Sequence, residues 1–286
     1  MPHLTPQEDI NKFFSIISKE FGIKLSYSDI MRLRIQVRQV MDVHGCANFA
    51  DLNKYLANGD SHQIKHDLLS SLTTNETQFM RDPQLFKLLK NNVLYELSSK
   101  FNNSLNVWSA ACSTGQEVYS LLFTLKDFNY LTRDKLDFKI TGTDIDKVPL
   151  HRAEMAIYHE SEIKRGLAKH YILDYFDKVD DYYQLKEEFK GYAKFKNLNL
   201  MSNFWTSERY HLVLCRNVLI YFGAQARQKI LKNMENQIVT GGYLVLGGSE
   251  SINNDSLKFR PINFPEYTIY EKIEVPYKDY KNFFAS

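Results

Sequence analysis

Residues 1–72 place their apolar side chains three or four positions apart, which is the spacing of one face of an α-helix. No alternation with a period of two interrupts this pattern, so no strand is predicted there. The pattern therefore predicts a small all-α region. Its expected helices begin near Pro6 and at Asp29, and two shorter ones run over Phe49–Leu56 and Gln63–Ser71.

After Asp82-Pro83 the pattern changes to short apolar runs that alternate with helical stretches. Proline suits the first position of a helix, so this pair predicts a helix that continues over Leu85–Leu97. Alternation of this length predicts an α/β domain over residues 85–286, with a doubly wound, mainly parallel sheet. The expected strands are Leu105–Ala110, Phe138–Thr143, His211–Cys215, Tyr243–Leu246 and a last one at Tyr267–Ile273.

Residues 175–197 break this alternation. Tyr182–Leu185 and Tyr192–Lys196 look like short strands separated by polar turns. We therefore expect a small antiparallel β subdomain inserted between two units of the main sheet.

Composition narrows the class of protein. The chain has 286 residues, of which 44% are hydrophobic, and its net charge of +2 does not suggest a nucleic-acid binder. Three cysteines without a CxxC pair predict neither a disulfide framework nor a zinc site. The N-terminus does not resemble a signal peptide, and no apolar run approaches the roughly 20 residues of a membrane span. We expect a cytoplasmic monomer without a metal and without membrane insertion.

Ligands of doubly wound sheets bind at the carboxyl ends of the strands. The turn after the first predicted strand contains Gly115 as its only glycine, so it lacks the G-x-G-x-x-G cradle for a pyrophosphate. This disfavours a nicotinamide dehydrogenase and suits a cofactor without phosphate, such as S-adenosylmethionine. Asp144 ends the second strand, where an acidic residue commonly binds ribose, although it could instead cap the next helix.

An arginine ends the apolar run of a later strand. Arg216 is costly to bury without a partner, so it is either part of a structural salt bridge or part of a site. The residues alone leave both open. Tyr221 follows where the chain leaves the sheet, and a lone tyrosine there is most often a core residue.

Two further segments have ordinary interpretations. Arg34 and Arg38 share a helical face, with Arg32 nearby, and such a stripe is usually only solvated. Residues 1–72 hold eight basic and eight acidic residues, so any basic signal is confined to this helix. The polar stretch 73–83 reads as a linker between two domains.

Taken together, several ordered stretches resemble the chemotaxis receptor (CheR-type) methyltransferases. The order of the motifs is more specific than any one of them. They are TTNETQFMRDPQLF at 73–86, VWSAACSTGQEVYS at 107–120, GTDID at 142–146, LNL at 198–200, LCRNVLIYF at 214–222 and GGYLVLGGSESI at 241–252.

The resemblance implies a class I methyltransferase domain with a helical receptor-docking domain at 1–72 and a β subdomain at 175–197. Residues 73–84 would be a linker that contributes to the cofactor site. That site would bind S-adenosylmethionine and its product S-adenosylhomocysteine, without a metal. It would be lined by Asn75, Thr77, Arg81, Glu117, Asp144, Asn199, Leu200, Arg216 and Asn217.

Within this site the resemblance implies separate roles. Glu117 would hold the amino group of the methionine part, and Asp144 the ribose. Asn199 and Leu200 would flank the adenine, and Asn217 would lie by the reacting end.

The activity implied is methyl ester formation on glutamates in the cytoplasmic helical methylation region of chemotaxis receptors. Arg81, Arg216 and Tyr221 would be the catalytic residues, acting by positioning. The receptor would dock weakly, in a salt-sensitive way, on three arginines of the second helix: Arg32, Arg34 and Arg38.

Some residues depart from the family pattern. Gln116 and Val118 stand where relatives often have glutamate and proline, and the turn at Asp177–Asp181 lacks the glycine of relatives that bind a receptor's C-terminal pentapeptide. We therefore expect no such tether. Two alternatives stay open: a non-catalytic module that binds S-adenosylmethionine in signalling, and a methyltransferase for another protein.

Overall fold

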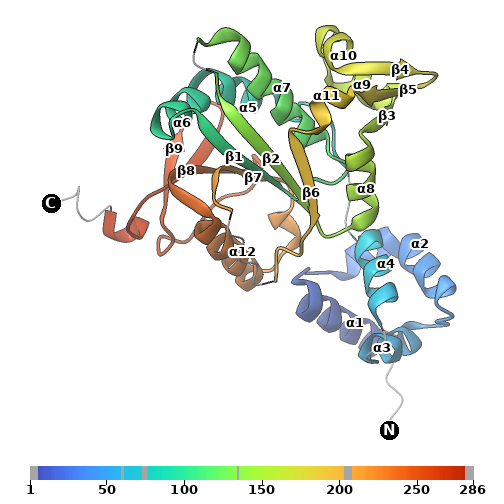
Figure 1. Cartoon of the computed structure of the whole chain (residues 1–286). Coiled ribbons are helices and arrows are strands. Elements are labelled where there is room, and N and C mark those ends of the chain that lie inside the picture. The colour runs from blue at the N-terminus through green and yellow to red at the C-terminus, as the bar shows by residue number, and fades with distance from the viewer. Residues whose placement is uncertain (1–5, 59–60, 73–75, 134, 203–207, 281–286) are drawn as a thin grey trace. The chain divides into compact units, whose positions relative to one another are not determined.

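The computed structural model describes residues 6–58, 61–72, 76–133, 135–202 and 208–280 (Figure 1). Contacts divide the chain into two units. The first consists of Met1–Asn75 together with Ile220–Arg227, and the second of Glu76–Leu219 together with Gln228–Ser286. The short return segment in the first unit interrupts the second, which the sequence pattern did not predict.

The first unit contains the helices expected for this region. Its core is formed by apolar side chains at helical spacing, including Phe13, Ile17, Val37 and Leu52, which are all buried. α1 packs against α3, and α2 packs against α4. The helices are α1 (Pro6–Phe21), α2 (Tyr27–Val43), α3 (Phe49–Ala57) and α4 (His62–Leu72).

The second helix starts earlier than its sequence suggested. Ser26 is its N-cap, and Asp29 occupies the third helical position. The Asp29 carboxylate accepts a hydrogen bond from the Ser26 amide at 2.9 Å, and the Ser26 hydroxyl accepts one from the Asp29 amide at 3.3 Å. Asp29 therefore closes a capping box rather than beginning the helix.

The second unit is built on a seven-stranded sheet in the order β6-β2-β1-β7-β8-β10-β9. β10 is antiparallel to both of its neighbours, and the other neighbouring strands are parallel, so the sheet is doubly wound and mainly parallel as predicted. The strands are β1 (Ser104–Ala110), β2 (Asp137–Asp144), β6 (Ala193–Asn197), β7 (Tyr210–Cys215), β8 (Ile238–Leu246), β9 (Phe259–Asn263) and β10 (Thr268–Lys272).

Winding in two directions places a switch point at β1. The chain goes from β1 to β2 on one side, and returns to β7 on the other side. Helices α7 (Gln116–Leu131) and α8 (Lys147–Met155) pack on β2, and α6 (Leu94–Lys100) packs on β1. The carboxyl ends of β1, β2 and β7 therefore lie side by side, where ligands of such sheets bind.

The small antiparallel sheet has a different membership from the one expected. It pairs β3 (Ile157–His159), β5 (Tyr182–Leu185) and β4 (Phe176–Val179) in the order β3-β5-β4. β6 instead pairs with β2 in parallel and forms one edge of the main sheet. Placing Tyr192–Lys196 in the inserted subdomain was therefore wrong, because alternation shows a strand but not its partner.

Other segments also differ from their predicted form. The helix expected over Leu85–Leu97 consists of α5 (Pro83–Leu88), a π-helical turn η1 (Leu89–Val93) and α6. β9 was not predicted, because it contains Pro261. Proline is tolerated in this strand because β9 lies at the edge of the sheet. The remaining elements are α9 (Glu160–Gly166), α10 (Lys169–Tyr175), α11 (Glu187–Lys190), the 3₁₀ turn η2 (Leu219–Tyr221) and α12 (Ala224–Gln237).

Candidate functional site

The turn after β1 is tight and requires glycine at one position. Ala111, Ser113 and Gly115 all have positive φ, of 60°, 51° and 89°. A Cβ on Gly115 would lie 2.8 Å from the Ala153 Cβ, so no larger residue fits. The turn leads directly into α7, which begins at Gln116.

Asp144 joins the ends of β1 and β2. Its carboxylate accepts hydrogen bonds from the Ser113 amide at 2.8 Å and from the Asp146 amide at 3.0 Å. Burial raises the pKa of Asp144, although these amide bonds oppose the rise. The helix-capping alternative for Asp144 is wrong: Asp146 caps α8 by accepting from the Val148 amide.

Arg216 directly follows β7 and pairs with two carboxylates, with only 2% of its own side chain exposed. Nη1 lies 2.8 Å from Glu117 Oε2, while Nη2 pairs with Asp82 and donates to the Arg81 carbonyl at 2.9 Å. Glu117 also accepts a hydrogen bond from the Ser109 hydroxyl at 2.7 Å. Burial opposes the charge of Arg216, but the carboxylates of Glu117 and Asp82 raise its pKa, so it stays protonated. The salt bridge that its sequence left open is present.

One donor of this guanidinium is left over. Arg216 Nε is buried and makes no hydrogen bond within the described part of the chain. The Tyr267 phenol lies beside the guanidinium and donates to the Leu246 carbonyl at 2.6 Å. A buried charged donor without an acceptor fits the carboxylate of an amino acid, such as the one that S-adenosylmethionine carries.

Residues 76–84, the described part of the predicted linker, belong to the second unit. Phe79 is fully buried, and the Met80 amide donates to the Ser120 hydroxyl at 2.8 Å. Asp82 occupies the N-cap position of α5, but its carboxylate pairs with Arg216 instead of capping the helix. This placement also lets the Arg81 carbonyl accept its hydrogen bond from Arg216. Thr77 is half-buried nearby in the chain, and Asn75 lies outside the described residues.

The adenine candidates lie next to Asp144 in the fold. The Leu198 amide donates to the Asp144 carbonyl at 2.8 Å, which fixes the following two residues beside the end of β2. Leu200 is buried. The side-chain oxygen of Asn199 accepts from the Met201 amide at 2.8 Å, so it shapes the turn.

Comparison with known proteins decides the family. Residues 75–268 match the model described as CheR methyltransferase, SAM binding domain.

The chain belongs to the CheR methyltransferase family.

Two chemotaxis protein methyltransferases, each 32% identical to this chain, agree with this membership. The chemotaxis protein methyltransferase of Borreliella burgdorferi is 32% identical over 260 residues, covering 88% of this chain and 92% of that protein. Chemotaxis protein methyltransferase 1 of Pseudomonas aeruginosa is 32% identical over 250 residues, covering 86% and 91%. A solved structure, the plantazolicin methyltransferase BpumL with a pentazolic analogue and S-adenosylhomocysteine, is 10% identical, with a TM-score of 0.35 over 77% of this chain and 61% of that one.

Membership confirms the family inferred from the motifs. The second unit is thus the S-adenosylmethionine-binding part of a methyltransferase, and Arg81, Glu117, Asp144, Leu200 and Arg216 lie within the matched range. The individual roles of these residues stay predictions.

Glu250 was not among the predicted residues at this edge of the sheet. Its carboxylate accepts hydrogen bonds from the amides of Asn217, Val218 and Gly247, at 2.8, 3.0 and 2.7 Å. These bonds fasten the end of β8 to the turn after β7, where Asn217 has a φ of 58°. A Cβ on Gly247 would lie 2.6 Å from Glu250 Oε2, so the glycine is required. The signal was the GGSES run after β8, which carried no obvious chemistry.

The remaining candidates belong to the first unit. Tyr221 is half-buried in the return segment Ile220–Arg227. All three arginines of α2 are exposed. Arg32 lies 3.5 Å from Asp29, whereas Arg38 binds Asp42 at 2.8 Å and donates to the Ala47 carbonyl at 3.0 Å.

The described residues contain neither a metal-binding group nor a membrane-spanning helix. No three His, Cys, Asp or Glu side chains gather there as a metal-binding group. Among the described helices, none combines the length and apolarity that crossing a membrane requires.

Proposed function

We propose that this CheR-family protein methylates glutamate side chains of a chemotaxis receptor, using S-adenosylmethionine and forming methyl esters. The names of its relatives support a chemotaxis substrate. The observation that carries the cofactor assignment is the buried Arg216 group at the carboxyl edge of the sheet, with its spare Nε donor. We expect the protein to act as a monomer in the cytoplasm.

The residues fit the parts of this cofactor. Arg216 Nε would donate to its carboxylate, and Glu117, which still has free lone pairs, would accept from its ammonium group. Asp144 would accept from the ribose hydroxyls through the lone pairs that the two amides leave free. The turn residues Asn199 and Leu200, fixed beside Asp144, would flank the adenine.

The proposed nucleophile needs no base. A glutamate with a pKa near 4.3 is protonated in only about one molecule in 500 at pH 7. When bound, S-adenosylmethionine supplies a methyl group on a positively charged sulfur. The protein's task is then alignment and exclusion of water, and alignment can contribute about 7–11 kcal/mol. We assign this positioning to Arg81, Arg216 and Tyr221.

The proposed docking surface for the receptor is the outer face of α2. Tyr27, Met31 and Ile35 follow one another at four-residue spacing and are 51%, 50% and 62% exposed. Three large apolar side chains on one exposed face are unusual unless they meet a partner. Residues four apart lie on the same side of a helix, so these three form a ridge. We call them the α2 ridge.

Two of the arginines border this ridge. At about 100° per residue, Arg38 and Arg34 lie about 20° and 60° from Met31, the centre of the ridge, whereas Arg32 lies about 100° from it. Arg34 also has no hydrogen bond or ion pair with any residue that the structure describes, while Arg38 is held by Asp42 and Ala47. Arg34 is therefore the arginine best able to bind a carboxylate of the partner.

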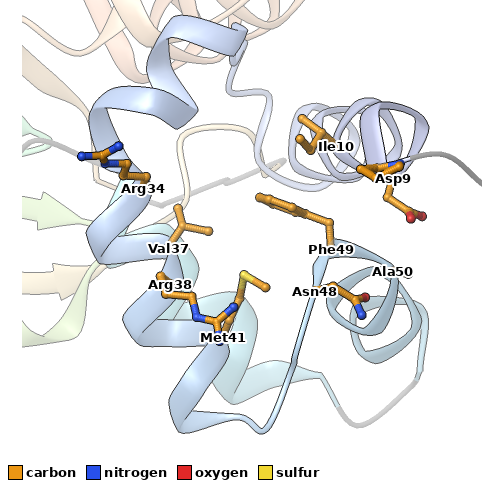
Figure 2. A pocket seen from close by; sticks show the side chains of 10 residues that line it. Asp9, Ile10, Arg34, Val37, Arg38, Met41, Asn48, Phe49 and Ala50 are labelled. Carbon is orange, nitrogen blue, oxygen red and sulfur yellow. The ribbon is translucent and has the colours of Figure 1, made fainter.

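A cavity of about 440 Å³ opens beside these arginines, between α1, α2 and the start of α3 (Figure 2). Phe49 and Ile10 lie across it from Val37 and Met41, and Arg34 and Arg38 also contribute to its lining. An apolar hollow with cationic neighbours suits an acidic helical segment that carries apolar side chains. The receptor's helical methylation region is the occupant we propose.

The decisive experiment separates methyl esters from other products. The protein is incubated with methyl-labelled S-adenosylmethionine and membranes that contain the receptor, and the products are treated with mild base. Released labelled methanol supports the proposal, because N-methyl groups survive this treatment. Binding of the cofactor without any methyl transfer would instead indicate the non-catalytic module. Label that resists base would indicate a different methyltransferase.

Two variants at opposite ends of β2 control this assay. Asp144→Asn should strongly reduce methanol release at cofactor concentrations below saturation, because it removes the charge proposed to bind ribose. Asp137→Asn makes the same chemical change at the exposed start of the strand and should have no effect. Receptors with and without a C-terminal pentapeptide should be methylated alike, if this protein uses no tether.

A further inference from the structure

A short main-chain bridge in the first unit holds the segment that carries Tyr221. α1 ends at Phe21, where Gly22 has a φ of 71° and donates its amide to Ser18. This left-handed glycine turns the chain away from the helix axis. Ile23 then pairs with Phe222 in an antiparallel bridge.

Two hydrogen bonds close this bridge. The Lys24 amide donates to the Tyr221 carbonyl at 2.9 Å, and the Gly223 amide donates to the Gly22 carbonyl at 3.4 Å. Ile23 is only 4% exposed, so one of the two bridged residues is buried. Through these contacts Ile220–Arg227 groups with the first unit, although the chain on either side of it belongs to the second.

The bridge also adjoins the proposed docking helix. Ser26, the N-cap of α2, comes two residues after Lys24, and Tyr27 of the α2 ridge follows at once. The backbone of Tyr221 is therefore bonded to the stretch of chain that begins the docking helix.

We propose that the N-terminal unit positions Tyr221 for methyl transfer through this Gly22–Lys24 bridge, in addition to binding the receptor. This inference rests on the proposed role of Tyr221. It makes Lys24, through its amide, a positioning residue for the reaction. The helical unit then contributes to turnover and not only to receptor affinity.

The test removes one N–H group. Lys24→Pro deletes the donor to Tyr221, whereas Lys24→Ala keeps it and serves as the matched control, because the Lys24 side chain is exposed. Because Lys24→Pro removes one hydrogen bond, we expect it to lower kcat on the order of fivefold. Lys24→Ala should match the wild type. The Kd for S-adenosylhomocysteine should be the same in both variants, because neither changes a proposed cofactor-binding residue of the second unit.

A double-mutant cycle distinguishes positioning from general destabilisation. If the bridge acts through the Tyr221 hydroxyl, Lys24→Pro should cause no further loss of kcat in a Tyr221→Phe background. An equal fold loss in both backgrounds would overturn the inference. So would a wild-type kcat for Lys24→Pro. If Tyr221→Phe alone retains full turnover, it is the proposed role of Tyr221 that fails.

A second pair guards against a folding defect in Lys24→Pro. Gly223→Pro removes the other donor of the bridge, and Gly223→Ala keeps it, with open space for the added Cβ. Thermal unfolding monitored by circular dichroism identifies the folded variants. A folded Gly223→Pro that turns over like Gly223→Ala would contradict the inference.

Discussion

Arg216 in the second unit and Arg34 in the first carry the same charge in opposite surroundings. Arg216 is 2% exposed and pairs with Glu117, Asp82 and the Arg81 carbonyl. Arg34 is exposed on α2 and has no ion pair within the described residues. Breaking a buried pair costs about 3–5 kcal/mol, whereas an exposed pair contributes about 0–1 kcal/mol. Burial therefore makes one arginine part of the fold and leaves the other available to a partner.

The largest expected effect is at the buried arginine. Arg216→Met should destabilise folding by about 3–5 kcal/mol, because Glu117 loses the partner of its buried charge. It should also weaken S-adenosylhomocysteine binding about a hundredfold, or about 2.7 kcal/mol, which lies in the upper range for the one charged hydrogen bond proposed from Arg216 Nε. Urea unfolding and calorimetry measure the two effects. Arg34→Met is the matched control and should leave both within error; a comparable loss there would break the comparison.

The next effect concerns the acidic residue of the same edge. Asp144→Asn should weaken binding of S-adenosylhomocysteine by about 10- to 100-fold at pH 7, because hydrogen bonds to a charged group contribute about 1.5–3 kcal/mol. Because burial raises the pKa of Asp144, wild-type affinity should fall, as the solution is acidified, at a higher pH than an ordinary aspartate would give. Calorimetry across a pH series checks this.

Folding stability should respond to Asp144 in the opposite sense. The native carboxyl holds its proton more tightly than the unfolded one, so its contribution to stability is full below the unfolded pKa. That contribution is lost as pH rises through the raised native pKa. In Asp144→Asn both pH dependences should disappear. A cofactor affinity that keeps its acid sensitivity in this variant would remove Asp144 from the site.

A smaller effect is expected in the return segment. Tyr221→Phe should lower kcat about tenfold, the loss of one positioning hydrogen bond of about 1.4 kcal/mol, with little change in cofactor Kd. Receptor methylation under saturating cofactor, together with calorimetry, separates the two quantities. Equal losses in turnover and in cofactor affinity would count against a role confined to the transfer step.

The smallest effect belongs to the exposed helix. Arg34→Ala should raise the KM for receptor by up to about fivefold at low salt, and this difference should vanish at high salt. Arg32→Ala, on another side of α2, should leave the KM unchanged. If receptor methylation did not depend on salt, the arginines would not belong to the docking surface. Ile35→Ser would then still test the α2 ridge.

Local pattern predicted the elements well, and the reason is physical. Helical spacing found α1 to α4, and apolar runs found β1, β2 and β7, because burial of one face acts on neighbouring residues. The charged residues at strand ends were also predictable, since the carboxyl edge of a parallel sheet collects them.

Partners distant in sequence were not predictable from the same pattern. Asp82 stands at the N-cap position of α5, yet its carboxylate pairs with Arg216, far along the chain. Glu250 lies in a recognised motif, but its partners could not be predicted, because its hydrogen bonds go to backbone amides that any residue possesses. The same limit applies to β6. Alternation predicted the strand, but not that it would pair with β2 in the main sheet.

Phe79 has a consequence for exchanging parts between relatives. Its ring packs edge-on against Tyr158 of β3, at 4.9 Å between centroids, and against Phe176 of β4, at 6.0 Å. The small antiparallel sheet and the 76–82 segment therefore share one aromatic core. A chimaera that imports another protein's small sheet must import a matching residue 79 as well, or leave a void beneath the segment that leads to Arg81. Natural diversification of this insert is constrained in the same way, so these two stretches should change together during evolution.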